Sequence, residues 1–379
     1  MARSYGFLST HPPTRCGLAT FNSALAAHLT GGGPHGGIVR VTTDGDDESP
    51  VPGVVHTWPA RGIAGWRAAA SALDRFDVAV VQHEYGIYPG PDGQDVLPLL
   101  QRLTVPSIVV LHTVLARPSA RQRTLLGQIV DAAGAVVTMT ETARVRLLAD
   151  YGADAGKVTV IPHGSADHSG ALLPRRQRPH LLTWGLIGPG KGIEWALQAL
   201  SLLQDLDPPP TYTVAGKTHP KVLEHCGEAY RNRLYRLGSR LGISAAVHYD
   251  SVYRDAPALS RLIRSADVVM LPYDSPDQVT SGVLIEAVAA GVPVVATSFP
   301  HAVELLTGGP GLLVPHRDAA ALAAAVRRIL TEPDLVAGFA SRTRALAPAL
   351  LWPAVAERYD ALAQRLLAAR LPATVAARS

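Results

Sequence analysis

The amino-acid sequence predicts an α/β protein of two domains, each built on a parallel sheet. Its 379 residues are too many for one ordinary hydrophobic core. Short apolar runs of strand length alternate with helical segments along the chain, which is the order typical of parallel sheets. With 47% hydrophobic and 17% charged residues, the composition is that of a globular protein.

Charge and cysteine content exclude several classes of function. The formal net charge is only +4 and no run of Lys or Arg occurs, so nucleic acid is a poor candidate partner, while a weak association with anionic membrane surfaces stays open. Cys16 and Cys226 lie far apart and form no disulfide or metal framework. Neither a signal peptide nor an apolar run of about 18 residues occurs, so we expect a cytoplasmic protein.

The first domain opens with a strand, a loop and a helix. Tyr5–Ser9 is an apolar run, and Leu18–Leu29 has the spacing of an amphipathic helix. The loop Thr10–Gly17 between them contains prolines and ends in glycine. A strand that runs through a glycine loop into a helix is a possible phosphate-binding element. Many α/β proteins begin in this way, so the arrangement alone identifies no function.

An acidic loop, Asp44–Glu48, follows the next predicted strand, Ile38–Thr42. Its carboxylates could hold a metal ion, but a solvated turn is the preferred interpretation. No metal site is therefore predicted.

Polar side chains follow the strand Val78–Gln82 at its carboxyl end, which is the end where ligands bind in open α/β sheets. His83, Glu84 and Tyr85 offer a flat ring and hydrogen-bonding groups, which suit a carbohydrate acceptor. The alternative is a polar strand end whose side chains bond only to their own loop.

His112 follows the strand Ser107–Leu111 at the same predicted edge. From the residues alone, His112 is equally a ligand contact, a capping residue or a packing residue. The rest of this domain is predicted as a strand at Ala135–Met139, a helix at 141–150 and a strand at Val158–Ile161.

A domain boundary is predicted at residues 165–179, which lack hydrophobic periodicity and contain three arginines and two prolines. The first domain then covers 1–165 and the second 166–352. A terminal helix is predicted at 353–371.

The second domain begins with the strand His180–Trp184 and a glycine-rich loop that contains Lys191. Lys191 is one of only four lysines among 35 basic residues, which hints at a site that needs a compact ammonium group. The loop Gly216–His219 ends another strand at the same edge. Further elements are predicted as strands at Tyr212–Ala215, Ala246–Tyr249 and Gly311–Val314 and a helix at Ala319–Leu330.

The stretch 266–297 predicts one βαβ unit of a parallel sheet. Its helix N-terminus follows the strand's carboxyl end, where unpaired N–H groups favour an anion. The parts follow in order as a strand at Val268–Leu271, a polar loop at Tyr273–Val279, a helix at Val283–Ala290 and a strand at Pro293–Ala296.

The start of this helix has the chemistry of a nucleotide site. Thr280 and Ser281 add hydroxyl groups, and Gly282 allows a close approach to the backbone. Glu286 is a lone acid in an apolar helix, and ribose hydroxyls would be suitable partners for its carboxylate. The alternative is an ordinary buried helix whose glutamate caps a neighbouring loop.

The same stretch resembles the signature region of family 4 retaining glycosyltransferases, which have the GT-B fold. Glu286 and the tail AVAAGVPVV match the family pattern, whereas Gln278 stands where the family has a second glutamate. The resemblance covers nearly the whole chain. It implies two Rossmann-like domains facing an interdomain cleft, with the donor nucleotide mainly on the C-terminal domain and the acceptor on the N-terminal one. The terminal helix at 353–371 resembles the segment that in GT-B proteins crosses back onto the first domain.

The resemblance also implies roles for single residues. Glu286 would bind the ribose of a sugar nucleotide, and Gln278 would lie beside the hydroxyls of the donor sugar. His112 corresponds to a histidine that touches the donor sugar.

Other residues correspond to the family's contacts with the donor diphosphate. Lys191 would hold the diphosphate, and Gly17 lies in a loop that approaches it. The helix N-terminus, including Val283, completes the expected donor site. Leu186 replaces the family's arginine, so one cationic contact is missing or supplied from elsewhere.

The predicted function is retaining transfer of a hexose from a UDP- or GDP-sugar to a carbohydrate, lipid-linked or other hydroxyl acceptor, without a metal or other cofactor. Lys191 and the helix N-terminus would stabilise charge on the leaving diphosphate. A glycoside phosphorylase of the same fold is one alternative, and a ribose ligand at Glu286 argues against it. The other is a nucleotide-sugar-binding module without turnover, which the departures at Leu186 and Gln278 permit. The base, sugar, acceptor and oligomeric state are not predicted.

Overall fold

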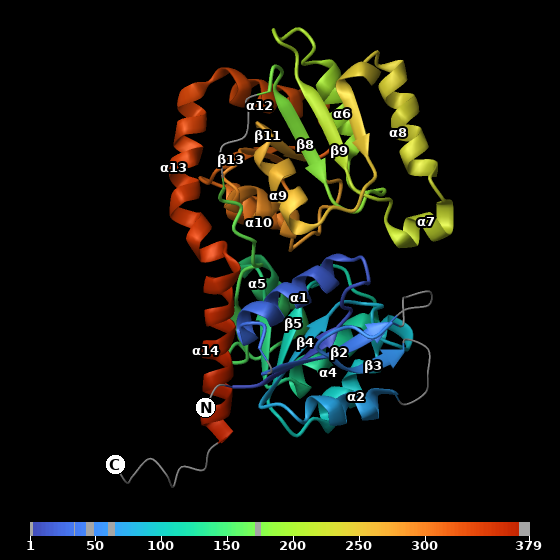
Figure 1. Cartoon of the computed structure of the whole chain (residues 1–379), viewed down its shortest axis with the longest axis vertical. Helices are drawn as coiled ribbons and strands as arrows, with labels where there is room; N and C mark the ends of the chain where they lie inside the picture. Colours follow the sequence, from blue (N-terminus) through green and yellow to red (C-terminus); the bar gives the residue numbers. More distant parts are fainter. Residues whose placement is uncertain (1–2, 34, 43–48, 60–64, 171–175, 371–379) are drawn as a thin grey trace. The chain divides into compact units, whose positions relative to one another are not determined.

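The computed structural model of the chain describes residues 3–33, 35–42, 49–59, 65–170 and 176–370 (Figure 1). The chain divides into two compact units. Unit 1 consists of Met1–Gly164 together with Trp352–Ser379, and unit 2 consists of Ser165–Leu351. The acidic loop Asp44–Glu48 and residue 371 of the predicted terminal helix lie outside the described residues.

Unit 1 contains a parallel sheet in the order β3-β2-β1-β4-β5-β6-β7. All its strand pairs that the structure describes are parallel, as apolar strands joined by helical crossovers require. The strands are β1 (Tyr5–Ser9), β2 (Gly36–Thr42), β3 (Val54–Pro59), β4 (Val78–His83), β5 (Ser107–Leu111), β6 (Ala135–Thr138) and β7 (Val158–Val160).

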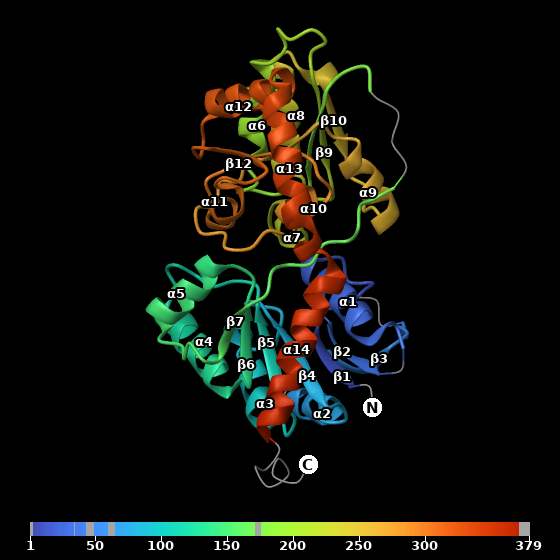
Figure 2. The ribbon, with the colours of Figure 1, turned by 90° about the vertical axis from the view of Figure 1, so that its left-hand side faces the viewer.

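Helices cover both faces of this sheet (Figure 2). Tyr5 and Phe7 of β1 share a buried core with side chains of α1 and α14. Gly6 points to the opposite face, where a Cβ would collide with Leu73 of α2 and Phe76. The helices are α1 (Gly17–Thr30), α2 (Gly65–Leu73), α3 (Val96–Arg102), α4 (Ala120–Ala132), α5 (Glu141–Tyr151) and α14 (Trp352–Arg370).

Unit 2 repeats the design with a sheet in the order β10-β9-β8-β11-β12-β13. Leu181 of β8 packs on the side of α6, α8 and α12, while Leu182 packs on the side of α10 and α11. The strands are β8 (His180–Trp184), β9 (Thr211–Ala215), β10 (Val247–Asp250), β11 (Val268–Leu271), β12 (Val294–Thr297) and β13 (Gly311–Val314). The helices are α6 (Ile193–Ser201), α7 (Pro220–Cys226), α8 (Ala229–Arg240), α9 (Ala256–Arg264), α10 (Gly282–Ala289), α11 (Pro300–Leu306), α12 (Ala319–Thr331) and α13 (Pro333–Leu350).

Each sheet has a topological switch point, where the strand order reverses direction. In unit 1 it lies between β1 and β4, and in unit 2 between β8 and β11. Ligands of open α/β sheets bind outside the carboxyl ends of the strands at such points. The loops that follow these four strands are therefore the first places to search for a site.

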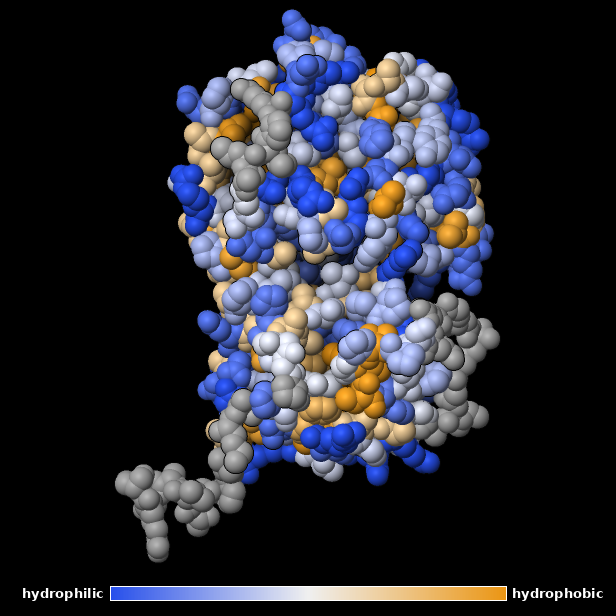
Figure 3. Space-filling view, viewed as in Figure 1, coloured by the Kyte–Doolittle hydropathy of each residue, from blue (hydrophilic) through white to orange (hydrophobic). Residues whose placement is uncertain are grey.

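The predicted α/β class with two Rossmann-like parallel sheets is confirmed. Every strand predicted from the sequence is present, and several have the predicted bounds, including β1, β5, β8, β11 and β13. The pattern did not identify strand β3 or the helices α2, α3, α4, α6, α7, α8, α9, α11 and α13. Polar side chains cover most of the visible face of unit 2, where apolar residues are exposed singly (Figure 3). No helix in the described ranges is long and apolar enough to cross a membrane.

Candidate functional site

The loop after β8 and the loop after β11 pack directly against each other in unit 2. The backbone N–H of Asp274 donates to the carbonyl of Gly190, 2.9 Å away. Gly192 has φ of 63°, and a Cβ there would collide with the carbonyl oxygen of Pro272. Only glycine fits this conformation and this contact. The two loops of the switch point therefore form one continuous surface.

Lys191 is held on this surface by an aromatic ring. Its Nζ lies 4.2 Å from the centroid of the Tyr273 ring, a cation–π contact. Tyr273 is only 1% exposed, and its carbonyl accepts hydrogen bonds from Thr297 and His316, so the ring is fixed. The ammonium group is thereby placed beside the start of the loop that leads to α10.

Glu286 lies one turn inside α10, with its carboxylate oriented by Trp184. The indole Nε1 of Trp184, the last residue of β8, donates to Oε2 of Glu286 over 3.2 Å. Burial raises the pKa of Glu286 to about 7, and the bond from Trp184 opposes that rise. This bond leaves Oε1 of Glu286 as an acceptor for a ligand.

The N-terminus of α10 is capped by its own neighbours. The Ser281 Oγ accepts from the N–H of Leu284, and the Ser281 N–H donates to Nδ1 of His301 over 2.8 Å. In the described part of the chain, no acceptor faces the N–H groups of Gly282 and Val283. These two groups point out of the helix end and are suited to bind an anion.

The predicted donor residues Gln278 and Thr280 lie in the loop that leads into α10. The amide Nε2 of half-buried Gln278 donates to the carbonyl of Thr280 over 3.0 Å. The Thr280 hydroxyl is buried and has no partner within the described ranges. Five predicted donor residues, from Gln278 to Val283, therefore lie at one helix entrance, with Glu286 one turn further on.

At the switch point of unit 1, Gly17 is the first residue of α1. A Cβ built on Gly17 would meet no atom within 4 Å, so this helix end is open to approach. The preceding Cys16 caps the helix, with Sγ accepting from the N–H of Ala19.

His112 is held by the strand beside it. Its Nε2 lies 2.9 Å from Oε1 of Gln82, and its backbone N–H donates to the carbonyl of His83. Because the amide oxygen accepts, Nε2 carries the proton and Nδ1 is left as an acceptor. A sugar hydroxyl is a suitable donor to that nitrogen.

The structure separates the three neighbouring acceptor candidates. Glu84 is half-buried and accepts hydrogen bonds from the Thr113 hydroxyl and the Tyr85 N–H, so its carboxylate stands beside His112. His83 is only 1% exposed, and the half-buried Tyr85 packs edge-on against it at 5.3 Å. Glu84 and the ring of Tyr85 are thus partly accessible at the strand end, while the Tyr85 hydroxyl and His83 are buried.

Burial keeps the imidazoles at this edge neutral. It lowers the pKa of His83 to about 4, of His112 to about 3 and of His163 to about 4. The rings of His112 and His163 both pack edge-on against Phe21, at 4.8 and 4.9 Å. The edge of unit 1 therefore presents neutral hydrogen-bonding groups beside one carboxylate.

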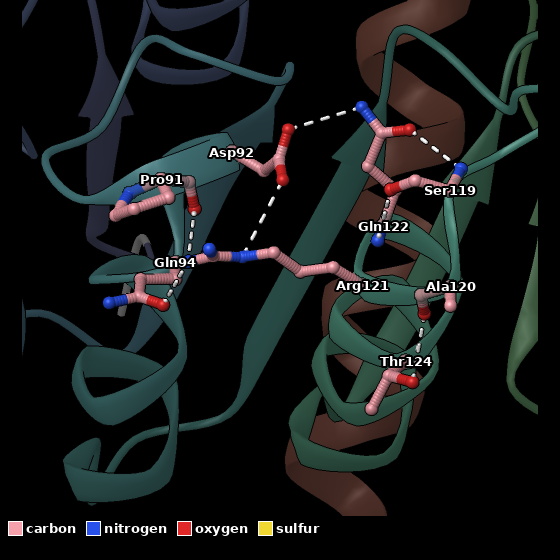
Figure 4. A network of polar contacts seen from close by, with 8 residues as sticks. All are labelled: Pro91, Asp92, Gln94, Ser119, Ala120, Arg121, Gln122 and Thr124. Atoms are coloured by element: carbon pink, nitrogen blue, oxygen red, sulfur yellow. Dashed lines mark hydrogen bonds and ion pairs between the residues drawn. The ribbon is translucent and has the colours of Figure 1, made fainter.

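A separate groove of about 510 Å³ lies between α3 and α4. Arg121 is the one cation among its lining residues, and it bonds to Gln94 and pairs with Asp92 (Figure 4). Gln122 bonds to Asp92 and closes a capping box with Ser119. These contacts join the start of α4 to the turn at 91–94 that precedes α3, so the groove is explained by packing and no ligand is assigned to it.

Four residues of the two edges were missed by the sequence analysis: Trp184, Tyr273, Gln82 and Thr113. Trp184 is the last residue of β8, and Tyr273 follows closely after β11. Because ligands of open α/β sheets bind at the carboxyl ends of strands, the reasoning that selected Tyr85 could have selected both residues. Gln82 and Thr113 act through neighbours on another strand, and no local pattern marks such contacts. Across the described ranges, no group of three or more His, Cys, Asp or Glu side chains could hold a metal ion.

Comparison with protein families gives two matches, which together span most of the chain. Residues 17–165 match Glycosyltransferase Family 4. Residues 178–332 match Glycosyl transferases group 1.

Two curated proteins are similar in sequence to parts of this chain. The chain is 31% identical over 256 residues to D-inositol 3-phosphate glycosyltransferase 2 of Catenulispora acidiphila, covering 63% of this chain and 57% of that protein. It is 31% identical over 188 residues to glycogen synthase of Mycobacterium tuberculosis, covering 48% of this chain and 42% of that protein. The chain thus spans about half the length of these relatives.

Solved structures share the fold along nearly the whole chain. Sucrose-phosphate synthase from Thermosynechococcus elongatus has a TM-score of 0.74 at 20% identity, covering 97% of this chain and all of that one. HepE of Anabaena, in complex with UDP, has a TM-score of 0.75 at 16% identity, covering 96% of this chain and all of that one. At such low identity the likeness establishes the fold.

Proposed function

The chain belongs to the family 4, group 1 glycosyltransferases, and on that premise we propose that it transfers a hexose from a UDP- or GDP-sugar to a hydroxyl acceptor. We further propose that the anomeric configuration is retained and that no metal ion takes part. The acceptor class is a carbohydrate or a lipid-linked sugar.

One observation carries the proposal: Lys191 and Glu286 flank the unit 2 switch point, Lys191 in the loop after β8 and Glu286 in α10, one turn beyond the loop after β11. Glu286 offers Oε1 as an acceptor, because Trp184 already occupies Oε2. A ribose provides hydroxyl donors for that oxygen, and a diphosphate provides the negative charge for Lys191. A nucleoside diphosphate is the ligand that satisfies both groups.

The same groups explain how the nucleoside diphosphate leaves the sugar. Charge builds on the diphosphate as its bond to the sugar breaks, and the Lys191 ammonium stabilises it more in the transition state than in the ground state. The N–H groups of Gly282 and Val283 add dipoles of the same sign. The leaving phosphate, on the same face of the sugar, accepts the proton of the attacking hydroxyl. Thr280, Ser281 and Gln278 complete the proposed donor site.

We propose His112 and Glu84 as polar contacts of unit 1 with sugar hydroxyls. Neutral His112 accepts through Nδ1, and Glu84 accepts through its carboxylate. His83 and Tyr85 form the wall behind them, and Gly17 leaves room for a phosphate at α1. A cytoplasmic location is part of the proposal, since the donors are cytoplasmic metabolites.

The test uses the purified full chain with UDP- and GDP-linked hexoses, with and without sugar acceptors, in the presence of EDTA. UDP-glucose comes first, because HepE is known in complex with it. Transfer with EDTA present, and a product of unchanged anomeric configuration by NMR, are expected. Turnover with inorganic phosphate and no nucleotide would instead identify a phosphorylase. Nucleotide binding without any turnover would identify a binding module.

A further inference from the structure

The loop after β9 is joined to the loop that carries Lys191. A bridge between Ile187 and Thr218 extends the β8–β9 pairing beyond the strands. The Ile187 N–H donates to the carbonyl of Lys217, and the His219 N–H donates to the carbonyl of Ile187, both over 2.8 Å. His219 is therefore fixed by the backbone beside the glycine-rich loop.

Gly188 lets the two loops approach closely. A Cβ on Gly188 would stand 3.1 Å from Val222 and 3.8 Å from the Cβ of His219. Lys191 belongs to the same turn, since its N–H donates to the carbonyl of Gly188 over 3.2 Å. His219 and Lys191 therefore flank one short segment of backbone.

The imidazole of His219 has a defined tautomer. Its Nδ1 accepts from the N–H of Lys221 over 3.2 Å and caps α7. The proton of the neutral ring is then on Nε2, which is a hydrogen-bond donor. Burial, followed by the charges of Lys221 and Lys191, lowers the pKa of His219, so the ring remains neutral near pH 7.

The surroundings of His219 suit an anion. Lys191, Lys217 and Lys221 all belong to these two loops and the start of α7, although the whole chain has only four lysines. Of the acids in the following segment, Glu224 of α7 is exposed, and Glu228 is already paired with Arg231 and accepts from the Thr218 hydroxyl.

We infer that Nε2–H of His219 donates to the diphosphate of the nucleotide sugar, in the place of the basic side chain that Leu186 does not supply. This inference rests on the proposed function. Leu186 is half-buried beside the same turn and offers no donor. His219 supplies a donor without a charge, so the positive charge at this turn comes from the lysines of the two loops, of which Lys191 is the one in the glycine-rich loop.

The test separates a diphosphate contact from a structural role. His219→Ser keeps an acceptor for the Lys221 N–H, because serine is a good N-cap, and removes the imidazole donor. His225→Ser is the matched control, since His225 is an exposed residue of α7 whose Nδ1 faces the Lys221 carbonyl. Calorimetry measures the affinity for UDP or GDP, whichever binds the wild type, and an NMR titration measures the weaker binding of the matching nucleoside.

We expect His219→Ser to weaken diphosphate binding about tenfold and to leave nucleoside binding unchanged, while His225→Ser changes neither. Equal losses for the diphosphate and the nucleoside would overturn the inference, because His219 would then only shape the loop. Unchanged diphosphate affinity would overturn it as well. A wild type that binds neither UDP nor GDP would overturn the proposed function, and the inference with it.

Discussion

The two switch points share one topology but differ in how they treat charge. In unit 2, the carboxyl edge of the sheet carries two ionisable groups. Lys191 lies over the Tyr273 ring, and the pKa of Glu286 is raised to about 7. In unit 1 the edge holds His83, His112 and His163 in neutral form, because burial lowers each pKa. Unit 2 is therefore equipped for a charged ligand and unit 1 for neutral hydroxyl groups.

The same difference gives the two edges opposite pH dependence. The histidines bind fewer protons in the folded state than in the unfolded state, so their contribution is complete above pH 6.5 and is lost as the pH falls through about 4. Glu286 binds its proton more tightly when folded, so its contribution is complete below pH 4.5 and is lost as the pH rises through about 7. We call the carboxyl edge of the unit 2 sheet, with Lys191 and Glu286, the donor edge. Ionisation of Glu286 there lowers the free energy of unfolding at neutral pH, and such a cost is frequent at binding sites.

The largest expected effect is that of Lys191→Ala, which removes the charge of the donor edge. Its contact strengthens as the diphosphate leaves, so kcat should fall by roughly 10²-fold or more with a smaller change in KM. Steady-state kinetics on the identified donor measures both. Lys157→Ala, which removes a lysine bonded to α4 carbonyls in unit 1, serves as the control. Near-normal turnover of Lys191→Ala would show that the positive charge in unit 2 takes no part in the mechanism.

Glu286→Gln tests, without any substrate, whether ionisation of Glu286 lowers the stability of the folded protein. The variant removes an ionisation that the folded state opposes, and a pKa raised from 4.5 to about 7 corresponds to about 3 kcal/mol at pH 8. The melting temperature should therefore exceed that of the wild type at pH 8, and the gain should shrink steadily toward pH 4.5. Scanning calorimetry across this range is the measurement. A gain that is independent of pH would show that packing, and not ionisation, causes it.

Glu286→Ala should weaken binding of the nucleoside diphosphate by roughly tenfold at pH 7, because hydrogen bonds to a charged group contribute about 1.5–3 kcal/mol and the carboxyl group is half protonated there. Affinity of the wild type should rise between pH 6 and pH 8 beyond the rise seen for the variant, since only the ionised carboxylate accepts from both ribose hydroxyls. Titration calorimetry at both pH values decides this. Parallel pH profiles would mean that Glu286 has a structural role only.

The sequence identified groups that stand next to strand ends in the chain, and missed groups that act across the fold. Lys191 and Glu286 follow strands within one turn of helix or loop, so their types and positions were enough to select them. The bond from Trp184 to Glu286 joins residues 102 positions apart, and that from the Ser281 N–H to His301 joins two elements, so no local pattern predicts either. The burial of His83 depends on which face of β4 its last residue presents, which the residue type does not determine. Helix α7 was missed because none of its residues is buried, so it has no apolar face.

The smallest expected effect, and the sharpest test of the donor edge, is Gln278→Glu. The Gln278 amide now donates to the Thr280 carbonyl, whereas a carboxylate would face that oxygen as a second acceptor and turn away. The change therefore alters both the sugar groups that can be paired and the shape of the loop before α10. Since an unpaired buried polar group costs about 1–3 kcal/mol, we expect the relative kcat/KM values of donor sugars to change by a few-fold, so that their rank order changes and not simply activity as a whole.

The experiment compares kcat/KM over sugar nucleotides that share one base, for wild type and the Gln278→Glu variant. The alternative is that main-chain groups of 279–282 hold the sugar and tolerate either residue. An identical rank order in both proteins would establish that alternative, and specificity would then have to arise from the neutral edge of unit 1.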